Sequence, residues 1–454
     1  MYRKYTEILC DWKERSNRKP LVIRGARQVG KTYLIREWAR KHFENYIELN
    51  FDETPSLNKL FVSDDVNAIL QNISLQSDVE IVSGKTLIFL DEIQRAPELF
   101  AKLRYFYEKR SDIHVVVAGS LLDFMLSNHT FSMPVGRIEY LHMGPMDFKE
   151  YLVAAGAKRL HDYLCEYQID MQIPKPVHDK LLTHLRTYMS IGGMPAAVRE
   201  YIESNSPKQC EMELSSILNT YGDDFSKYQQ KVDVDKLRLI LDKVPGLVGK
   251  KLKYTDISRD DKSAKIKTGL NQLELARILY KVHHSAGNAP PLRAEKKERD
   301  YKLLFLDIGL LMRSLGLNIL HLQEDNFLIS NSGALTEQFI GQQWLSQQQS
   351  YDLPELYYWN REKTGTSAEV DYLFQIDGII VPVEVKAGTT GSLKSLHVFA
   401  AEKQSPVAVR YNLCEPSVTE VTSRIPGKKQ HTFKLLSLPL YLVSETERLL
   451  KQEG

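Results

Sequence analysis

Leu-Val-Ile-Arg-Gly-Ala-Arg-Gln-Val-Gly-Lys-Thr, residues 21–32, is the stretch that decides the fold of the first part of the chain. The apolar run Leu21–Arg24 predicts a strand, and the pattern over Thr32–His42 predicts a helix. Between them, Gly25–Thr32 matches GxxxxGK[ST]. Its glycines let a loop wrap tightly, so that backbone N–H groups point at phosphate oxygens. The stretch therefore predicts a phosphate-binding loop, and a chance glycine-rich turn is the alternative.

The side chains of this loop suggest individual roles. Lys31 is expected to reach the β- and γ-phosphates of a nucleotide, and the Thr32 hydroxyl to ligate Mg²⁺. The start of the following helix adds a positive dipole end. The residues expected to contact the nucleotide are Gly25, Ala26, Arg27, Gln28, Val29, Gly30, Lys31, Thr32, Tyr33 and Ser120.

A second motif, Leu87-Ile88-Phe89-Leu90-Asp91-Glu92, places two carboxylates at the end of an apolar strand. Ligands of open parallel sheets bind at that end of the strands. Asp91 is expected to hold Mg²⁺, and Glu92 to polarise the attacking water as a general base. Two solvated acids at an ordinary strand end are the alternative, which the neighbouring phosphate loop disfavours. Together the two motifs predict ATP hydrolysis.

Two further residues have a functional and a structural interpretation of similar weight. Ser120 follows the strand His114–Ala118 and either senses the γ-phosphate or caps a helix. Arg137 either stabilises transition-state charge, in its own subunit or a neighbour's, or forms a structural ion pair. The sequence leaves both choices open.

Short apolar runs alternate with helical patterns over the first 150 residues. Besides Leu21–Arg24 and Thr86–Leu90, strands are predicted at Tyr46–Phe51, His114–Ala118 and Ile138–His142, and a second helix at Glu98–Lys109. This alternation predicts an α/β fold with a parallel sheet covered on both faces.

The remainder of the chain changes character twice. The stretch from Pro145 to Tyr228 is mostly helical, with a Gly-Gly-Met-Pro turn before the helix Ala196–Ser204. Val234–Leu315 also has a helical pattern, and a helix over Thr268–Val282 that runs into a short extended segment suits a winged helix. Beyond Asn331, a helix over Ala334–Ser346 precedes three predicted strands. These strands are Glu355–Trp359, Glu369–Gln375 and Ile379–Lys386, with a hairpin turn at Asp377-Gly378.

These motifs resemble those of a family of prokaryotic AAA-like P-loop ATPases, the archaeal-type ATPase superfamily. The resemblance is carried by the phosphate loop, the Leu87–Glu92 strand, Val117–Ser120, Gly136-Arg137, the box Pro145–Tyr151, Gly192–Pro195 and Lys302–Leu310, and it covers nearly the whole chain. It implies a P-loop ATPase core over residues 1–150, a helical lid over 151–230, a winged-helix-like region over 231–325 and a restriction-endonuclease-like α/β domain over 326–454. It also implies adenine as the base, and it leaves the biological role open.

Four side chains of the last region form a second candidate site. Alternation along a strand puts Glu384 and Lys386 on one face, Asp371 lies on the preceding strand, and Glu337 on the upstream helix. From spacing alone, a solvated strand face is the preferred interpretation. The resemblance instead implies a PD-(D/E)xK nuclease site, in which Asp371, Glu384 and Glu337 hold Mg²⁺ and Lys386 activates water. It leaves open whether the site cuts DNA.

Basic residues gather at Lys250–Lys267 and Arg293–Lys302, and they suggest contacts with DNA phosphates. Asn271, Gln272 and Glu274 are polar residues that could meet base edges. Acids are mixed into the same stretches, so a solvated face of mixed charge is an equal alternative. A protein partner is the other expected ligand of this region.

Composition narrows the class of protein without choosing a function. The 454 residues carry a net charge of only +2, so a nucleic-acid surface must be local. The four cysteines include no CxxC pair, which argues against a zinc knuckle and a disulfide framework. Neither a signal peptide nor a membrane-spanning run is recognised, so a soluble, cytoplasmic protein is expected. Oligomeric state cannot be inferred from one chain.

Three functions follow as expectations. The first is an Mg²⁺-dependent ATPase whose nucleotide state moves a DNA-binding or partner-binding module, with nuclease chemistry as an addition. The second is a switch that binds ATP, turns over slowly and acts on a protein partner, with the last domain as a non-catalytic scaffold. The third is an ATP-controlled DNA-binding protein that does not cleave.

Overall fold

A computed structural model describes residues 1–127, 133–228, 233–317, 332–361, 368–388, 392–425 and 429–452. The expected boundaries at 230/231 and 325/326 lie outside these residues, and the four expected domains stay a prediction. Within the described residues the chain forms two compact units. The first comprises residues 1–145, 275–278 and 349–354, and the second comprises 146–274, 279–348 and 355–454.

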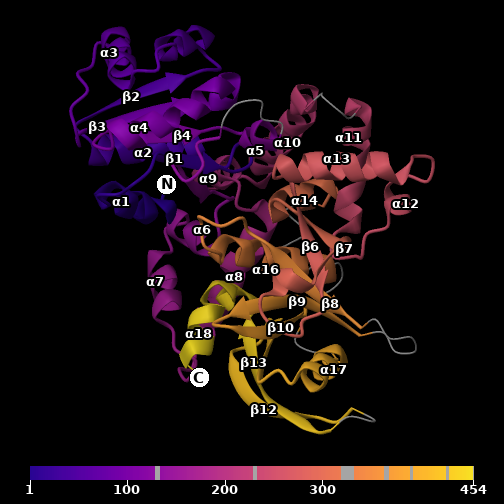
Figure 1. The fold of residues 1–454 in the computed structure, drawn as a ribbon. Coiled ribbons are helices and arrows are strands. Elements are labelled where there is room, and N and C mark those ends of the chain that lie inside the picture. Colours follow the sequence, from indigo (N-terminus) through magenta and orange to yellow (C-terminus); the bar gives the residue numbers. More distant parts are fainter. Residues whose placement is uncertain are drawn as a thin grey trace. The chain divides into compact units, whose positions relative to one another are not determined.

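The first unit contains a five-stranded parallel sheet of order β2-β3-β4-β1-β5 (Figure 1). Its strands are β1 (Leu21–Arg24), β2 (Asn45–Asn50), β3 (Thr86–Asp91), β4 (His114–Ala118) and β5 (Glu139–His142). Its helices are α1 (Tyr5–Glu14), α2 (Lys31–His42), α3 (Val66–Ser77), α4 (Leu103–Lys109) and α5 (Leu122–Ser127), with 3₁₀ turns η1 (Pro55–Phe61), η2 (Ile93–Arg95) and η3 (Pro97–Lys102). The expected parallel α/β sheet is confirmed.

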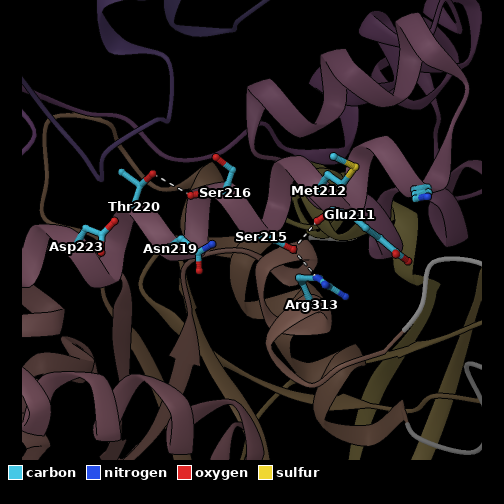
Figure 2. Close-up of a pocket in the computed structure, with 9 residues that line it drawn as sticks. Glu211, Met212, Ser215, Ser216, Asn219, Thr220, Asp223 and Arg313 are labelled. Atoms are coloured by element: carbon cyan, nitrogen blue, oxygen red, sulfur yellow. Dashed lines mark hydrogen bonds between the residues drawn. The ribbon is translucent and has the colours of Figure 1, made fainter.

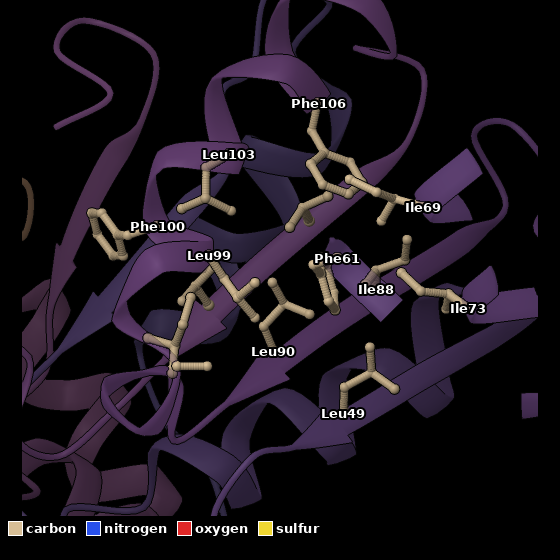
Figure 3. Packing of buried hydrophobic residues seen from close by; sticks show 14 of the residues in the cluster. Leu49, Phe61, Ile69, Ile73, Ile88, Leu90, Leu99, Phe100, Leu103 and Phe106 are labelled. Atoms are coloured by element: carbon tan, nitrogen blue, oxygen red, sulfur yellow. The ribbon is translucent and has the colours of Figure 1, made fainter. Parts of the chain in front are cut away.

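The core of this unit explains the apolar run Leu87–Leu90 of β3. All six residues of β3 are buried, as expected for a central strand with helices on both faces. Ile88 and Leu90 of β3 pack with Ile69 of α3 and Phe106 of α4 (Figure 3). The rigid strand carries Asp91 at its carboxyl end.

The described part of the second unit begins with a succession of helices. These are α6 (Phe148–Ala154), α7 (Lys158–Glu166), α8 (Lys175–Ile191), α9 (Pro195–Ser204), α10 (Pro207–Asp224), η4 (Phe225–Tyr228), α11 (Val234–Lys243), η5 (Val244–Leu247), α12 (Tyr254–Ile257) and α13 (Ser263–Leu275). The Gly-Gly-Met-Pro turn is fixed by Asp307, which accepts a hydrogen bond from the Gly193 N–H over 2.7 Å. The expected helical character of this stretch is confirmed.

An eight-stranded mixed sheet of order β12-β13-β11-β10-β9-β8-β6-β7 completes the second unit. Its strands are β6 (Leu279–Ser285), β7 (Lys296–Phe305), β8 (Leu356–Asn360), β9 (Glu369–Ile376), β10 (Ile379–Val385), β11 (Val407–Asn412), β12 (Ser417–Ser423) and β13 (His431–Pro439). The accompanying helices are η6 (Leu292–Glu295), α14 (Ile308–Ser314), α16 (Ser332–Gln347), α17 (Lys394–Lys403), η8 (Leu440–Glu445) and α18 (Thr446–Gln452).

Some sequence-based expectations need correction. The helix expected over Thr268–Val282 ends at Leu275, because Arg277 adopts a left-handed backbone (φ 61°) and β6 follows. The helical pattern expected up to Leu315 contains β6 and β7, and β6 pairs in parallel with β8 from much later in the chain. The expected helix Glu98–Lys109 is a 3₁₀ helix followed by α4.

The hairpin expected at Asp377-Gly378 is confirmed. Ile376 of β9 pairs with Ile379 of β10, so two residues form the turn. Both have positive φ, 45° for Asp377 and 80° for Gly378, which matches the primed turns that twisted strands prefer. The turn sets the register that brings Asp371 beside Val385.

Candidate functional site

The phosphate loop leaves β1 and enters α2 through three residues with positive φ, namely Gly25, Gln28 (φ 64°) and Gly30. Gly30 precedes α2 in a left-handed conformation (φ 91°, ψ 24°). Gly25 has φ 155°, and a Cβ on it would lie 2.1 Å from the Met143 carbonyl oxygen. Only glycine fits at Gly25, because the loop passes directly against the segment after β5.

The ammonium of Lys31 lies inside this loop. Its Nζ donates to the carbonyl oxygens of Gly25 over 2.9 Å and Ala26 over 2.7 Å. Burial lowers its pKa to about 8, although Glu92 and Asp91 oppose the shift. Lys31 is therefore held by the same turn that the sequence predicts to wrap phosphates.

Thr32 and Asp91 meet across the first two motifs. The Thr32 hydroxyl donates to Asp91 Oδ2 over 2.8 Å, and the N–H of Glu92 donates to Asp91 Oδ1 over 3.0 Å. Asp91 is only 2% exposed, and burial raises its pKa to about 6 despite these hydrogen bonds. A hydroxyl beside a carboxylate is a donor set that suits Mg²⁺.

Glu92 and Ser120 lie on neighbouring strand ends. Glu92 has a left-handed backbone (φ 53°), which turns its side chain away from the run of β3. Its Oε2 accepts hydrogen bonds from Ser120 Oγ over 3.4 Å and from the amide of Gln94. The sequence predicts separate roles for Glu92 and Ser120, and no motif contains Gln94.

The N-terminal segment supports the loop in a way that the sequence did not reveal. Arg3 is 3% exposed, and its guanidinium donates to the carbonyl oxygens of Val29 and Gly144, each over 2.7 Å. It thus ties the phosphate loop to the segment after β5. No motif contains Arg3, so only its partners identify it.

A buried cluster of two guanidiniums and one carboxylate lies at the carboxyl end of β1. Asp123 of α5 pairs with Arg24, and its Oδ2 lies 2.8 Å from Arg277 Nε. Burial and the charge of Arg277 lower the pKa of Arg24 to about 10. Arg24 directly precedes the phosphate loop. Arg277 lies two residues before the first residue of β6.

The other expected nucleotide contacts have mixed surroundings. Ala26 and Val29 are buried in the loop, whereas the Tyr33 ring is 48% exposed on α2. Arg137 Nε donates to Glu108 Oε1 over 2.8 Å on the surface, as its structural interpretation expects. The Arg137 side chain is 44% exposed to solvent.

The C-terminal candidate residues Glu337 and Asp371 lie near a buried lysine, Lys302, that their spacing in the sequence does not predict. Lys302 of β7 is 2% exposed, and its Nζ lies 2.5 Å from Glu369 Oε1 and 3.5 Å from Glu337 Oε2. Asp371 Oδ2 accepts from the Val385 N–H over 2.8 Å. Lys302 could not be found from spacing because β7 is far from β9 and β10 in the sequence.

The expected acid-x-lysine pair is present as an internal contact. Lys386 Nζ donates to Glu384 Oε1 over 2.5 Å, so the two side chains share a face as expected. Burial and the charge of Asp371 raise the pKa of Glu337 to about 8 and of Glu384 to about 7. Burial lowers the pKa of Lys302, but the carboxylates around it raise it more, and the net shift is upward.

These acids do not have the arrangement of a metal site. Within residues 1–452, apart from the undescribed gaps, no three His, Cys, Asp or Glu side chains are grouped to hold a metal ion. Glu384 Oε2 is buried without a hydrogen-bond partner. The other contacts of these carboxylates are with two lysines and a backbone N–H, which differs from the open donor set that Mg²⁺ draws from a nuclease site.

Some of the basic and polar residues proposed for DNA contact are paired within the chain. Lys281 Nζ donates to Asn271 over 2.7 Å and to Glu274 over 2.5 Å, so these two polar side chains already have a partner. Lys251 pairs with Asp300 over 2.6 Å, and Arg293 with Glu355 over 3.1 Å. The mixed-charge interpretation gains support from these pairs.

A separate surface pocket of about 610 Å³ lies along α10 in the second unit (Figure 2). Arg313 Nε donates to Ser215 Oγ over 2.7 Å at its wall, and Ser215 Oγ donates to the Glu211 carbonyl. The remaining labelled residues are polar apart from Met212, which is 63% exposed. Nothing in the pocket converges on a ligand.

The parallel sheet, its glycine-bounded loop and the paired Thr32 and Asp91 have the arrangement of a P-loop nucleotide-binding domain. A family model described as an AAA domain matches residues 17–152. Two domains of unknown function, DUF8612 and DUF4143, match residues 182–320 and 332–440. The restriction-endonuclease-like assignment is not among these matches.

Comparisons with individual proteins give distant relatives. The uncharacterized protein MJ1544 of Methanocaldococcus jannaschii is 25% identical over 175 residues, which are 38% of this chain and 35% of that protein. The chain thus spans about a third of the length of this curated relative.

Solved structures are similar over longer stretches at low identity. The Walker-type ATPase PABY2304 of Pyrococcus abyssi aligns at 13% identity and a TM-score of 0.45, covering 69% of this chain and 95% of its own. The ORC2 protein of Aeropyrum pernix, solved with ADPNP and ADP, aligns at 13% identity and a TM-score of 0.36, covering 71% and 93%. Similarity at this level carries no argument about function. No described helix is long and apolar enough to cross a membrane.

Proposed function

We propose that this protein binds ATP with Mg²⁺ at the loop Gly25–Thr32 and hydrolyses it. The observation that carries the proposal is the 2.8 Å hydrogen bond between Thr32 Oγ1 and Asp91 Oδ2, which joins the two sequence motifs at one point. Glu92 follows Asp91 directly, so a candidate base lies next to the candidate metal ligands. A chance glycine-rich turn would not place these groups together.

Each side chain then has a defined task. Lys31 leaves the carbonyls of Gly25 and Ala26 to bind the β- and γ-phosphates, and Thr32 and Asp91 hold Mg²⁺. When bound, the ion neutralises negative charge on the phosphates. Glu92 orients the attacking water and accepts its proton.

Two residues complete the proposed site. Ser120 donates to Glu92 and can respond to the γ-phosphate through that contact. Arg137 supplies positive charge to the transition state, in its own subunit or across a subunit interface, once it leaves Glu108. In this structure Arg137 is paired with Glu108, so it must break this ion pair before it can act on a nucleotide.

The nucleotide state is proposed to control a DNA-binding or partner-binding module formed by the second unit. Two short segments, residues 275–278 and 349–354, belong to the first unit although the chain on both sides of each belongs to the second. A conformational change at the strand ends of the first unit can be transmitted to the second unit through residues 275–278 and 349–354.

The alternative is a slow switch that binds ATP and acts on a protein partner, with the last domain as a scaffold. The ion pairs of Lys251 and Arg293 favour a protein partner over DNA, because paired cations attract phosphates weakly. Nuclease chemistry is not part of either proposal, because no observation on the C-terminal acids favours it.

Steady-state hydrolysis by Glu92→Gln separates the two proposals. An ATPase loses its turnover, by about a hundredfold or more, while nucleotide binding stays near the original affinity. The exposed Glu98→Gln on η3 is the matched control and keeps its rate. Equal, slow turnover in both variants would instead support the switch.

DNA affinity measured at two salt concentrations, with and without ATP, tests the partner. Binding that weakens steeply with salt supports DNA as the partner, because phosphate contacts release counterions. Salt-independent or absent binding removes both DNA functions. Plasmid nicking that survives Asp371→Ala excludes the C-terminal acids as its source.

A further inference from the structure

The ammonium of Lys302 stands among the acids that the sequence assigned to a metal. It reaches Glu369 at 2.5 Å and Glu337 at 3.5 Å, and its Nζ lies 5.1 Å from the centre of the Tyr358 ring. Lys302 is 2% exposed, so its charge is compensated by these groups and not by water. A buried ammonium without such partners is strongly destabilising.

The neighbouring carboxylates have partners of their own. Asp371 accepts from the Val385 N–H over 2.8 Å, and Glu384 accepts from Lys386 over 2.5 Å. Four acids therefore face two lysines and a backbone donor from the same chain. This set of contacts differs from that of an open metal site, in which the acids bind a metal ion and not the ammonium of a lysine.

The position of Lys302 depends on the edge of the eight-stranded sheet. Lys302 lies opposite Val282 in the antiparallel β6–β7 ladder, and Val282 pairs in parallel with Leu356 of β8. Glu369 begins β9, where it pairs with Asn360 of β8. Lys302 thus lies in the region that matches DUF8612, whereas Glu337 and Glu369 lie in the region that matches DUF4143.

We infer that Lys302 is a built-in cation that takes the place of a divalent metal among Glu337, Glu369 and Asp371. With Lys302 present, the C-terminal domain needs no Mg²⁺ and binds none at Asp371. Removal of the ammonium leaves an excess of buried carboxylates, which a divalent cation can then occupy. The inference does not depend on the proposed ATPase function, because the P-loop contributes no residue to it.

Mn²⁺ binding to the full-length chain without nucleotide, followed by electron paramagnetic resonance, tests this inference. The unaltered chain is expected to show no Mn²⁺ site that Asp371→Asn removes. Lys302→Met is expected to gain one saturable site, which is lost again in the double variant with Asp371→Asn. Mn²⁺ bound at the P-loop is not affected by Asp371→Asn, so this variant distinguishes the two sites.

Two control variants sharpen the result. Lys302→Arg keeps the charge and gains no site. Lys149→Met removes another lysine that pairs with a buried acid, Glu445 at 2.6 Å, and also gains none. An Asp371-dependent Mn²⁺ site in the unaltered chain, or no gained site in Lys302→Met, overturns the inference.

Thermal unfolding covers the case in which Lys302→Met folds poorly. If a divalent cation replaces the ammonium, Mn²⁺ raises the Tm of Lys302→Met and leaves that of the unaltered chain unchanged, because ligands stabilise only the state they bind. A variant that Mn²⁺ fails to stabilise contradicts the inference even if little protein is folded.

Discussion

The hydroxyl of Thr32 and the carboxylate of Asp91 lie 2.8 Å apart, although 58 residues separate them in the chain. Thr32 lies in the first turn of α2 and Asp91 is the last residue of β3. Both β3 and β1 are neighbours of β4 in the parallel sheet. Parallel strands end at one edge, which is why a residue after β1 and a residue at the end of β3 can share a ligand.

The buried Lys31 predicts a nucleotide affinity that falls at alkaline pH. Its pKa of about 8 in the free protein means that the ammonium loses its proton above that pH, whereas bound phosphates stabilise the charged form. The dissociation constant for ATP is expected to rise by up to about tenfold per pH unit above pH 8. Titration of Glu92→Gln with ATP between pH 7 and 9.5 measures this without hydrolysis.

Lys31→Arg is the control for that titration, because arginine keeps its proton throughout the range. Any affinity that the arginine variant retains is expected to be independent of pH. A constant affinity of the lysine protein up to pH 9.5 contradicts the prediction.

Asp91 predicts a gain in stability when it loses its charge. Burial raises its pKa from 3.8 to about 6, so the folded state binds more protons than the unfolded state between these values. Stability therefore falls as pH rises through this window, and the full cost persists above pH 6. Asp91→Asn is expected to be about 1–3 kcal/mol more stable at pH 7.5 while losing hydrolysis.

This advantage has a characteristic dependence on pH. It shrinks as pH falls below 6, because the aspartic acid is then neutral in the folded state as well. Urea unfolding at pH 7.5 and 5 measures it, with the exposed Asp11→Asn of α1 as a control that changes little. Lower stability of Asp91→Asn at pH 7.5 argues against a buried charge.

Asp123 predicts a large loss of stability when it is removed alone. Asp123→Ala leaves Arg24 and Arg277 facing each other in a buried site, which costs about 3–5 kcal/mol for a broken ion pair. Adding Arg277→Met removes one of the two positive charges and restores part of the loss. Urea unfolding of both single variants and the double variant gives the interaction energy, and strictly additive losses rule out the cluster.

The contacts of Arg3 predict that a residue outside the sequence motifs affects ATP binding. Arg3→Ala removes two charged donors from the carbonyls of Val29 and Gly144. The expected result is about 1–3 kcal/mol lower stability, from the two carbonyls left without donors. About tenfold weaker ATP binding is expected from a less rigid loop.

Arg15→Ala is the matched control for Arg3, since it removes a surface pair with Glu139 whose arginine side chain is 48% exposed. It is expected to change stability by under about 1 kcal/mol and to leave ATP affinity unchanged. Equal effects of the two variants on ATP affinity contradict a special role of Arg3.

Much of the first unit could be predicted because its elements depend on local patterns. Buried parallel strands have apolar sequences that can be recognised directly. The predicted strands Leu21–Arg24 and His114–Ala118 have the same bounds as β1 and β4. The second unit was harder to predict. β7 begins Lys-Lys-Glu-Arg-Asp, without apolar alternation, and it is a strand because it pairs with β6 at a sheet edge.

The sequence alone determined the loop Gly25–Thr32, the acids Asp91 and Glu92, and the sheet between them, because spacing and apolar runs are local properties. The partners of these residues were decided only by the tertiary structure. Arg3 beneath the loop, Arg277 beside Asp123 and Lys302 among the acids all reach their places through strand order and burial. A buried charge is positioned by whatever distant group compensates it, and one sequence does not show which group that is.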